Sequence, residues 1–165
     1  MIISISIVGD KEVIAKLGKM PATVHAALLQ KVTTLALKLE AYIKKNKLSG
    51  QVLNRKTGRL ARSITHAVDA QPHAVWGRVF STGDVPYAGI HEYGGQTGAH
   101  IILPKKASVL AFVKDGQKVF ARKVNHPGST MPERSYMRSS LREMSVEIST
   151  AMKEAVLQGA KRAME

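Results

Sequence analysis

The chain has no cysteine among its 165 residues. This absence excludes disulfide bonds, thiolate metal sites and cysteine nucleophiles. Aromatic residues make up only 5% of the sequence and do not interleave with the basic residues, which argues against a stacking surface for single-stranded nucleic acid. No apolar run approaches the roughly 20 residues that span a bilayer, and the first residues lack a signal-peptide pattern. We therefore expect a soluble protein of the cytoplasm that has no membrane partner.

Acidic residues are also scarce. The chain has 12 Asp and Glu against 25 Lys and Arg, which gives a net charge of +13. Seven basic residues and no acidic residue lie between Glu40 and Asp69. A positive field of this strength favours contact with nucleic acid or with an acidic protein surface, although a basic face that serves only solubility has the same composition. A free-standing protein that binds nucleic acid non-specifically through its phosphates therefore remains one open interpretation.

The first half of the chain predicts a long helix followed by a hairpin. Residues 2–8 alternate as in a half-buried strand, and a short helical segment follows at 11–20. From Pro21 onward, apolar residues recur at three- and four-residue steps, which predicts a long amphipathic helix. Residues 45–60 are basic and polar, and we expect a mobile arm there that leads into a turn of helix. The runs at 65–70 and 74–81 predict a β-hairpin.

The second half predicts short strands and a second long helix. Strand-like runs occupy 100–104, 108–113 and 118–124, and the last two are joined by a tight-turn sequence. An apolar stripe predicts a final helix that opens at Pro132, with methionines that fill the core or an interface. The expected fold class is therefore α+β: a central antiparallel sheet packed against a long N-terminal helix and a long C-terminal helix, in a single domain spanning 1–165.

Catalytic motifs are incomplete throughout the sequence. His91 and Glu92 begin like a zinc-binding His-Glu-x-x-His helix, but the fifth position is Gly95. The glycines near this site match no phosphate-binding loop, and no Gly-x-Ser-x-Gly elbow is present. We expect no catalytic residue, no metal and no cofactor. A metal hydrolase at His91, Glu92 and His100 remains the enzymatic alternative.

Four fragments, taken in order, resemble a known family. They are TGRLARSI at 57–64, VPYAGIHEYGG at 85–95, ILPKKASVLAF at 102–112 and VFARKVNHPGSTMPERSYMRSSL at 119–141. Together they resemble the tail-component family of long-tailed bacteriophages, the small neck and tail-completion proteins related to the minor tail proteins of lambda-like phages. The shared features are a Thr-Gly-x-Leu segment, a His-Glu-aromatic-Gly turn, a Pro-Lys-Lys-Ala strand start and a His-Pro-Gly loop. The resemblance covers about half of the chain.

This resemblance implies structural work and no catalysis. It implies a virion protein of the head–tail junction, present in the host cytoplasm during assembly, that joins head to tail as a closed homo-oligomeric ring of about six subunits. Adjacent neck and tail proteins, and genomic DNA passing through the channel, are the implied partners. The basic residues expected near DNA or an acidic partner are Lys44, Lys45, Arg55, Lys56, Arg59 and Arg62.

The same resemblance identifies a set of residues for a structural corner or a subunit contact. Within the fragment at 85–95, Tyr87, Ile90 and Tyr93 fall at three-residue steps, and we expect these three side chains to face the sheet together. Glu92 is expected to pair with Arg59 or Arg62. The full set is Tyr87, His91, Glu92, Tyr93, Gly94, His126, Pro127 and Gly128.

Overall fold

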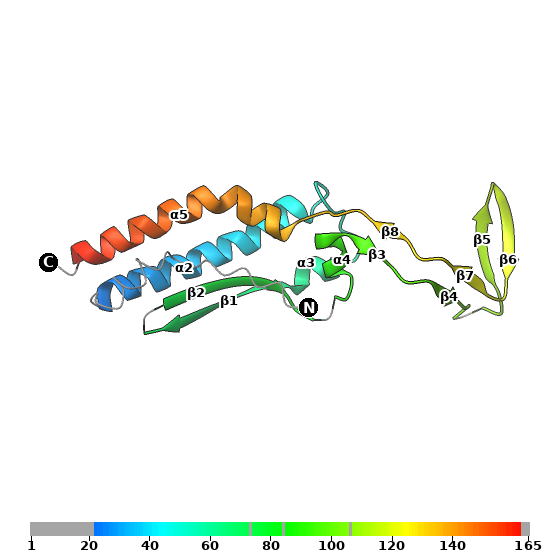
Figure 1. Ribbon diagram of the computed structural model, residues 1–165, viewed down its shortest axis with the longest axis horizontal. Helices are drawn as coiled ribbons and strands as arrows, with labels where there is room; N and C mark the ends of the chain where they lie inside the picture. Colours follow the sequence, from blue (N-terminus) through cyan, green and yellow to red (C-terminus); the bar gives the residue numbers. More distant parts are fainter. Residues whose placement is uncertain (1–21, 73, 84, 106, 163–165) are drawn as a thin grey trace.

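The computed structural model describes residues 22–72, 74–83, 85–105 and 107–162. The molecule is elongated: helices and a hairpin form a packed core, and paired strands extend from one end of it (Figure 1). The helical elements are α2 (Ala22–Tyr42), the π-helical turn η1 (Ile43–Lys47), α3 (Arg59–Ser63), α4 (Ala88–Tyr93) and α5 (Met137–Arg162). The strands are β1 (Ile64–Gln71), β2 (Ala74–Ser81), β3 (Gly95–Gln96), β4 (His100–Ile102), β5 (Leu110–Lys114), β6 (Gln117–Ala121), β7 (Val124–His126) and β8 (Thr130–Met131).

The core consists of α5, α2 and the antiparallel hairpin β1–β2 in successive layers, with α2 in the middle (Figure 1). Apolar residues at three- and four-residue spacing give α2 a buried face. This face contains Val24, Leu28, Val32, Leu35, Ala36 and Leu39. Opposite it, α5 buries Met144, Ile148 and Ala155. Burial of each larger side chain stabilises the fold by about 1.5–3 kcal/mol. The packing of two long helices against antiparallel strands confirms the α+β fold expected from the sequence.

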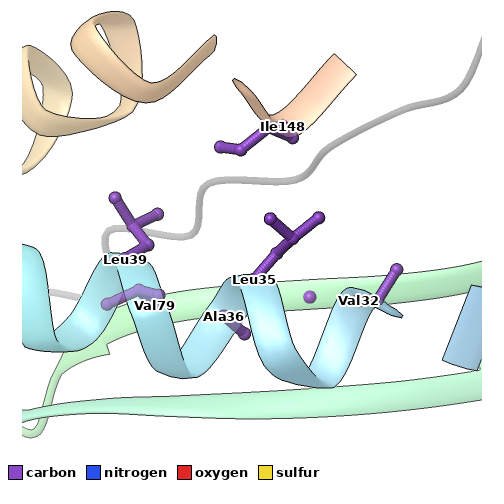
Figure 2. A pocket seen from close by; sticks show the side chains of 7 residues that line it. Val32, Leu35, Ala36, Leu39, Val79 and Ile148 are labelled. Carbon is purple, nitrogen blue, oxygen red and sulfur yellow. The ribbon is translucent and has the colours of Figure 1, made fainter. Parts of the chain in front are cut away.

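A glycine allows the hairpin to approach α2 closely. A Cβ added at Gly77 of β2 would lie 2.8 Å from Cγ1 of Val32. Figure 2 shows Leu35 and Leu39 of α2 beside this contact, with Ile148 of α5 above them. The space that remains between the three elements is about 10 Å³. This is about the size that one water molecule requires, so the interior of the core offers no ligand site.

The basic segment after α2 is attached to the core. Leu48 and Leu53 are 3% and 9% exposed and belong to the same hydrophobic cluster as Leu39 and Tyr136. Gly50, with φ of 116°, lets the chain reverse after η1. The segment expected as a mobile arm at 45–60 therefore comprises the end of η1, a loop that packs on the core through two buried leucines, and the start of α3.

Residues 95–131 form the extension from the core. We call this extension the arm; it is a different segment from the basic one at 45–60. Its strands pair antiparallel in nested order, with β3–β8 nearest the core, then β4–β7, then the β5–β6 hairpin at the tip (Figure 1). Within the described chain, these strands contact mainly their own partners. No described residue of the arm belongs to the buried hydrophobic core. The arm is therefore a narrow projection one layer thick.

The hairpin at 64–81, the three later strands and the two long helices lie where the sequence predicts them. Buried Met137 and Met144 confirm that methionines fill the core. The expected start of the final helix at Pro132 is wrong, since α5 begins at Met137. The strand expected at 2–8 and the helical segment expected at 11–20 lie outside the described residues. None of the described helices is long and apolar enough to span a membrane.

Candidate functional site

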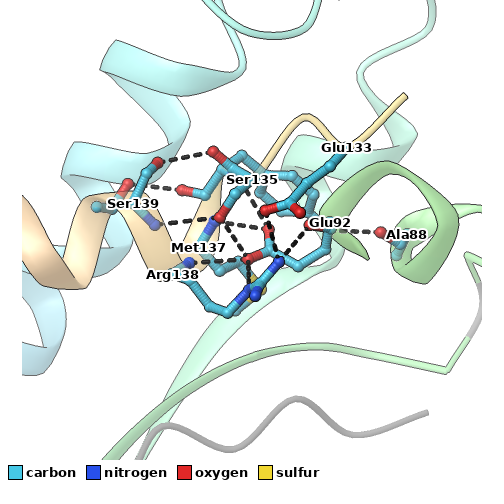
Figure 3. Close-up of polar contacts among 9 residues, drawn as sticks. Ala88, Glu92, Glu133, Ser135, Met137, Arg138 and Ser139 are labelled. Atoms are coloured by element: carbon cyan, nitrogen blue, oxygen red, sulfur yellow. Dashed lines mark hydrogen bonds and ion pairs between the residues drawn. The ribbon is translucent and has the colours of Figure 1, made fainter. Parts of the chain in front are cut away.

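The carboxylate of Glu92 lies where α4 meets the start of α5 (Figure 3). This side chain is 0% exposed. Its Oε2 accepts hydrogen bonds from the backbone N–H groups of Tyr136 and Met137 at 2.8 and 2.9 Å. Its Oε1 accepts from the backbone N–H of Arg138 and from the hydroxyl of Ser135, both at 2.9 Å. Glu92 therefore caps the N-terminus of α5, where backbone N–H groups lack helical partners and a negative charge is favoured.

Arg138 balances the charge of this buried carboxylate. Its Nε lies 3.1 Å from Oε1 of Glu92, and its Nη2 donates to the backbone carbonyl of Glu92 at 2.8 Å and to Glu133 at 2.9 Å. The guanidinium also lies 4.4 Å from the centroid of the Tyr93 ring, a cation–π contact. A buried carboxylate is tolerated only when it is paired and hydrogen-bonded, and both conditions hold here. We call this group the Glu92 corner.

The partner of Glu92 differs from the one that the sequence suggested. We expected Arg59 or Arg62, whereas the ion pair is made with Arg138. Arg138 and Ser135 were both missed because they lie more than 40 positions away along the chain. One signal was available: Ser135 directly precedes the apolar stripe of the last helix, and such a residue marks a helix N-terminus that attracts a carboxylate.

The tyrosines of the corner do not face the sheet. Tyr87 and Tyr93 are 38% and 47% exposed, so the expectation that they pack inward together is wrong. The buried face of α4 is instead formed by Ala88 and Glu92, which are four residues apart. The expectation failed because the cap on α5 places Glu92 inside. The exposed ring of Tyr87 packs edge-on against His91, with centroids 5.9 Å apart.

Burial of the corner also changes Tyr136. Burial, followed in size by the negative charge of Glu92, raises the pKa of the Tyr136 hydroxyl well above its usual value. The hydroxyl donates to the backbone carbonyl of Ala88 at 3.3 Å, and its ring is 0% exposed. Tyr136 therefore remains neutral and joins α5 to α4.

Glycine is required where the chain leaves the corner. Gly94 has φ of 69°, and a Cβ there would lie 2.9 Å from the backbone nitrogen of Glu133. The following Gly95 has φ of 140° and begins β3. The two positive φ angles turn the chain from α4 into β3.

The His-Pro-Gly sequence forms a second corner within the arm, between the β4–β7 and β3–β8 pairs. His126 stacks on His100 of the paired strand with ring centroids 4.9 Å apart, and its Nδ1 accepts from the backbone N–H of Gly128 at 3.0 Å. Gly128 has φ of 94°, and a Cβ there would lie 2.1 Å from the backbone oxygen of Thr97. Pro127 is exposed between them. His126 and Gly128 therefore hold the outgoing and returning segments of the arm close together.

The geometry does not assemble a hydrolase from His91, Glu92 and His100. His100 is paired with His126 in the arm, and the oxygens of Glu92 are occupied by the start of α5. Among the described residues, no group of three His, Cys, Asp or Glu is placed to hold a metal ion.

The six basic residues singled out in the sequence fall into separate places. Lys44 makes an ion pair with Glu40 at 2.5 Å. Lys45 and Arg62 are exposed on η1 and α3. The other three, Arg55, Lys56 and Arg59, line an open groove of about 580 Å³.

The groove is basic with an apolar floor, and we call it the basic groove. Its fourth cationic side chain is Arg134, which sequence reasoning missed because it lies in the loop before α5. The floor comes from Leu48, Val52, Leu53, Leu60 and Ala61, and Tyr87 and His91 of the corner form part of the wall. No acidic residue is among the described residues that line it.

His91 joins the basic groove to the Glu92 corner. Its backbone carbonyl accepts from the N–H of Arg134 at 2.8 Å. Its Nδ1 is buried and has no hydrogen-bond partner among the described residues. Burial, with a smaller effect from the charge of Arg134, lowers the pKa of the imidazole below its usual value. His91 is therefore neutral at pH 7 and contributes an uncharged aromatic wall.

Comparison of the chain with protein-family models, curated protein sequences and solved structures finds no match.

Proposed function

We propose that the chain is a structural virion protein of a long-tailed bacteriophage, a neck or tail-completion subunit that forms a ring at the head–tail junction and joins head to tail. The resemblance of the four sequence fragments suggests this setting. The observation that carries the assembly role is the arm, whose shape and surface suit a subunit that is completed by its neighbours.

The arm exposes large apolar side chains that a free monomer has no reason to keep in water. Ile101 and Leu103 are each 60% exposed, and Phe120 and Val113 at the tip are 65% and 68% exposed. Val113 and Phe120 lie on the same face of the β5–β6 hairpin, as its register shows. Exposed apolar side chains grouped in this way are typical of an interaction site. The outer edges of β5 and β6 are also unpaired within the described chain. Free strand edges pair readily with another chain, so the tip has two means of binding a neighbour.

The arrangement of core and arm suits repeated head-to-tail contact. The arm projects from one end of the core (Figure 1). In the proposed ring it would contact the core of a neighbour, a surface unlike its own. Repeated contacts between unlike surfaces generate a closed ring when the rotation from one subunit to the next brings the last subunit back to the first. The Glu92 corner fits this role because it fixes the direction in which the arm leaves the core.

The test combines two measurements. Disruption of the gene in the phage that carries it should leave filled heads and complete tails unjoined, as seen by electron microscopy of the lysate. In the purified protein, replacement of Val113 and Phe120 by Ser should abolish rings seen by negative-stain microscopy and sedimentation. Val146→Ser is the matched control, since Val146 is 75% exposed and belongs to α5, outside the arm. Joined particles in the disrupted phage would rule out the proposed role.

A second candidate function is supported by charge alone. The net charge of +13 favours non-specific binding of nucleic acid through phosphates. This function predicts that the isolated monomer binds short duplex DNA with a steep dependence on salt. Absence of binding at low salt would remove it.

A further inference from the structure

We infer that the basic groove binds an acidic segment of a partner protein that carries at least one apolar side chain. The inference deepens the proposed function, because it names the chemistry of a partner in the assembly. It concerns a surface separate from the arm, and it is testable on the purified protein without any ring.

The charge of the groove selects an anionic occupant. Arg55, Lys56 and Arg134 make no ion pair with any described acidic residue, and Arg59 adds a fourth cationic side chain. Three of the four come from the loop and short helix after Leu53, and the fourth comes from the loop before α5. Cations converge on one space from two segments that are distant in the sequence, which a merely solubilising surface does not require. Carboxylates suit such a site because guanidinium groups bind them in bidentate fashion.

The floor of the groove distinguishes a protein segment from DNA. Leucine, valine and alanine side chains form the floor, and the rings of Tyr87 and His91 stand beside it. An apolar floor is stabilised when an apolar side chain covers it, and DNA has no such group to offer at its phosphates. Specific peptide sites in proteins combine an apolar anchor pocket with a charged rim. A concave space of about 580 Å³ fits a few side chains and not the convex face of a duplex.

A second copy of this chain is a poor occupant. The arm is the part that reaches a neighbour, and its sequence carries six Lys and Arg against one acidic residue, Asp115. Like charges in contact oppose binding. On α5, Glu143 is bonded to Lys47 and Tyr42, and Glu147 is paired with Lys38, which leaves Glu154 as the one described acidic residue of this helix outside such a pair. A single carboxylate is not an acidic segment. The occupant is therefore a different protein.

The partner is unidentified, so the test uses synthetic probes with the full-length protein. The main probe is a short fluorescein-labelled peptide that alternates Glu with Leu and Phe. A twin in which Gln replaces every Glu tests charge, and a poly-Glu peptide of equal length tests the apolar floor. Fluorescence anisotropy should show binding of the main probe, with both comparison peptides at least about tenfold weaker.

Matched variants locate the binding site. Lys56→Gln and Arg134→Gln each remove one charge from the groove and should weaken binding of the main probe about fivefold. Lys45→Gln and Lys153→Gln remove the same charge at exposed positions outside it and should leave binding within about twofold. All four positions are exposed, so thermal unfolding should confirm an unchanged fold.

Three outcomes would overturn the inference. Equal losses from groove and control variants would show attraction to the overall charge only. Tighter binding of a short DNA duplex than of the peptide, lost in the groove variants, would assign the groove to nucleic acid. Self-association that disappears in Lys56→Gln and Arg134→Gln would assign it to a second copy of the chain. Failure of the peptide test leaves the unjoined-particle test of the proposed function intact, and the reverse also holds.

Discussion

At the residue scale, Glu92 shows how a pair that resembles catalytic chemistry performs a structural task. An adjacent His and Glu beside glycines is a pattern that metal sites also use. Here the carboxylate accepts five hydrogen bonds from residues at the start of α5. The side chain has no exposed surface that a substrate could contact. The difference from a catalytic carboxylate lies in the donors, because three of them are backbone N–H groups of a helix N-terminus.

Glu92→Gln should therefore destabilise the core strongly. The amide keeps the shape of the side chain but removes its charge, and its NH₂ group would face N–H donors in place of an acceptor. We expect a loss of about 3 kcal/mol in the free energy of unfolding, as for other buried ion pairs that lose one partner. Urea denaturation followed by circular dichroism measures this loss.

The control for this change is Glu133→Gln. Glu133 bonds the same Arg138 but its side chain is 55% exposed, so we expect a change of no more than about 0.5 kcal/mol. Similar effects from the two substitutions would contradict the assignment of Glu92 as the buried cap.

Gly128 is a residue whose replacement should act on the arm alone. Gly128→Ala places a Cβ 2.1 Å from the backbone oxygen of Thr97 in a conformation that L residues rarely adopt. We expect a strain of about 1–3 kcal/mol, which the arm relieves by opening between the β4–β7 and β3–β8 pairs. Hydrogen–deuterium exchange should become faster in residues 95–131 and remain unchanged in α2 and α5.

Gly98→Ala is the matched control, because a Cβ at Gly98 meets no atom within 4 Å. Its exchange pattern should equal that of the unaltered protein. Faster exchange of α5 in Gly128→Ala would show that arm and core are coupled, contrary to this expectation.

At the element scale, Glu40 joins the end of α2 to the hairpin. It accepts from Nζ of Lys44 on η1 and lies 2.5 Å from Nδ1 of His66 on β1. Burial acts to raise the pKa of the Glu40 carboxyl, but the hydrogen bonds from Lys44 and His66 outweigh burial and hold this pKa below its usual 4.5. A lowered pKa in the folded state means that the ionised carboxylate stabilises the fold.

The pH dependence follows from that sign. The contribution of Glu40 is complete above the unfolded pKa of 4.5 and disappears as pH falls through the lower folded pKa. Glu40→Gln should therefore be less stable than the unaltered protein at about pH 7, and the difference should shrink toward about pH 3. Urea denaturation across this range measures it. Glu154→Gln on the exposed face of α5 should show no such pH-dependent difference.

Elements were predictable from sequence wherever one periodic pattern determined them. The buried positions of α2 follow a helical stripe, and the β1–β2 hairpin follows two alternating runs. The start of α5 was not predictable in this way, because it depends on Glu92, which is distant in sequence. The basic groove was only half visible: the charges at 55–59 stand out in the sequence, but their meeting with Arg134 and an apolar floor is a property of the fold.

At the scale of the whole molecule, the packed core and the proposed assembly surface lie in different parts. Among the residues that the structure describes, the buried hydrophobic ones lie within 24–88 and 136–155, on either side of the arm in the sequence. The arm contributes exposed apolar side chains and nested strand pairs in place of a core. The molecule therefore keeps a surface that costs solubility, which is consistent with burial against a neighbour in the assembled state.

Removal of the arm should leave the core folded and abolish assembly. Thr97 donates its backbone N–H to the carbonyl of Ser129 at 2.9 Å. The outgoing and returning segments of the arm are therefore close enough at this point for a short turn to join them. We would delete residues 98–128 and join Thr97 to Ser129 through an Asn-Gly turn, which suits antiparallel strands. The thermal midpoint should change by no more than about 3 °C, since no buried core side chain is lost. Sedimentation should show a monomer, whereas the Val146→Ser protein still assembles. If the variant without residues 98–128 unfolds, or if it still forms rings, then the arm has a different role from the one proposed.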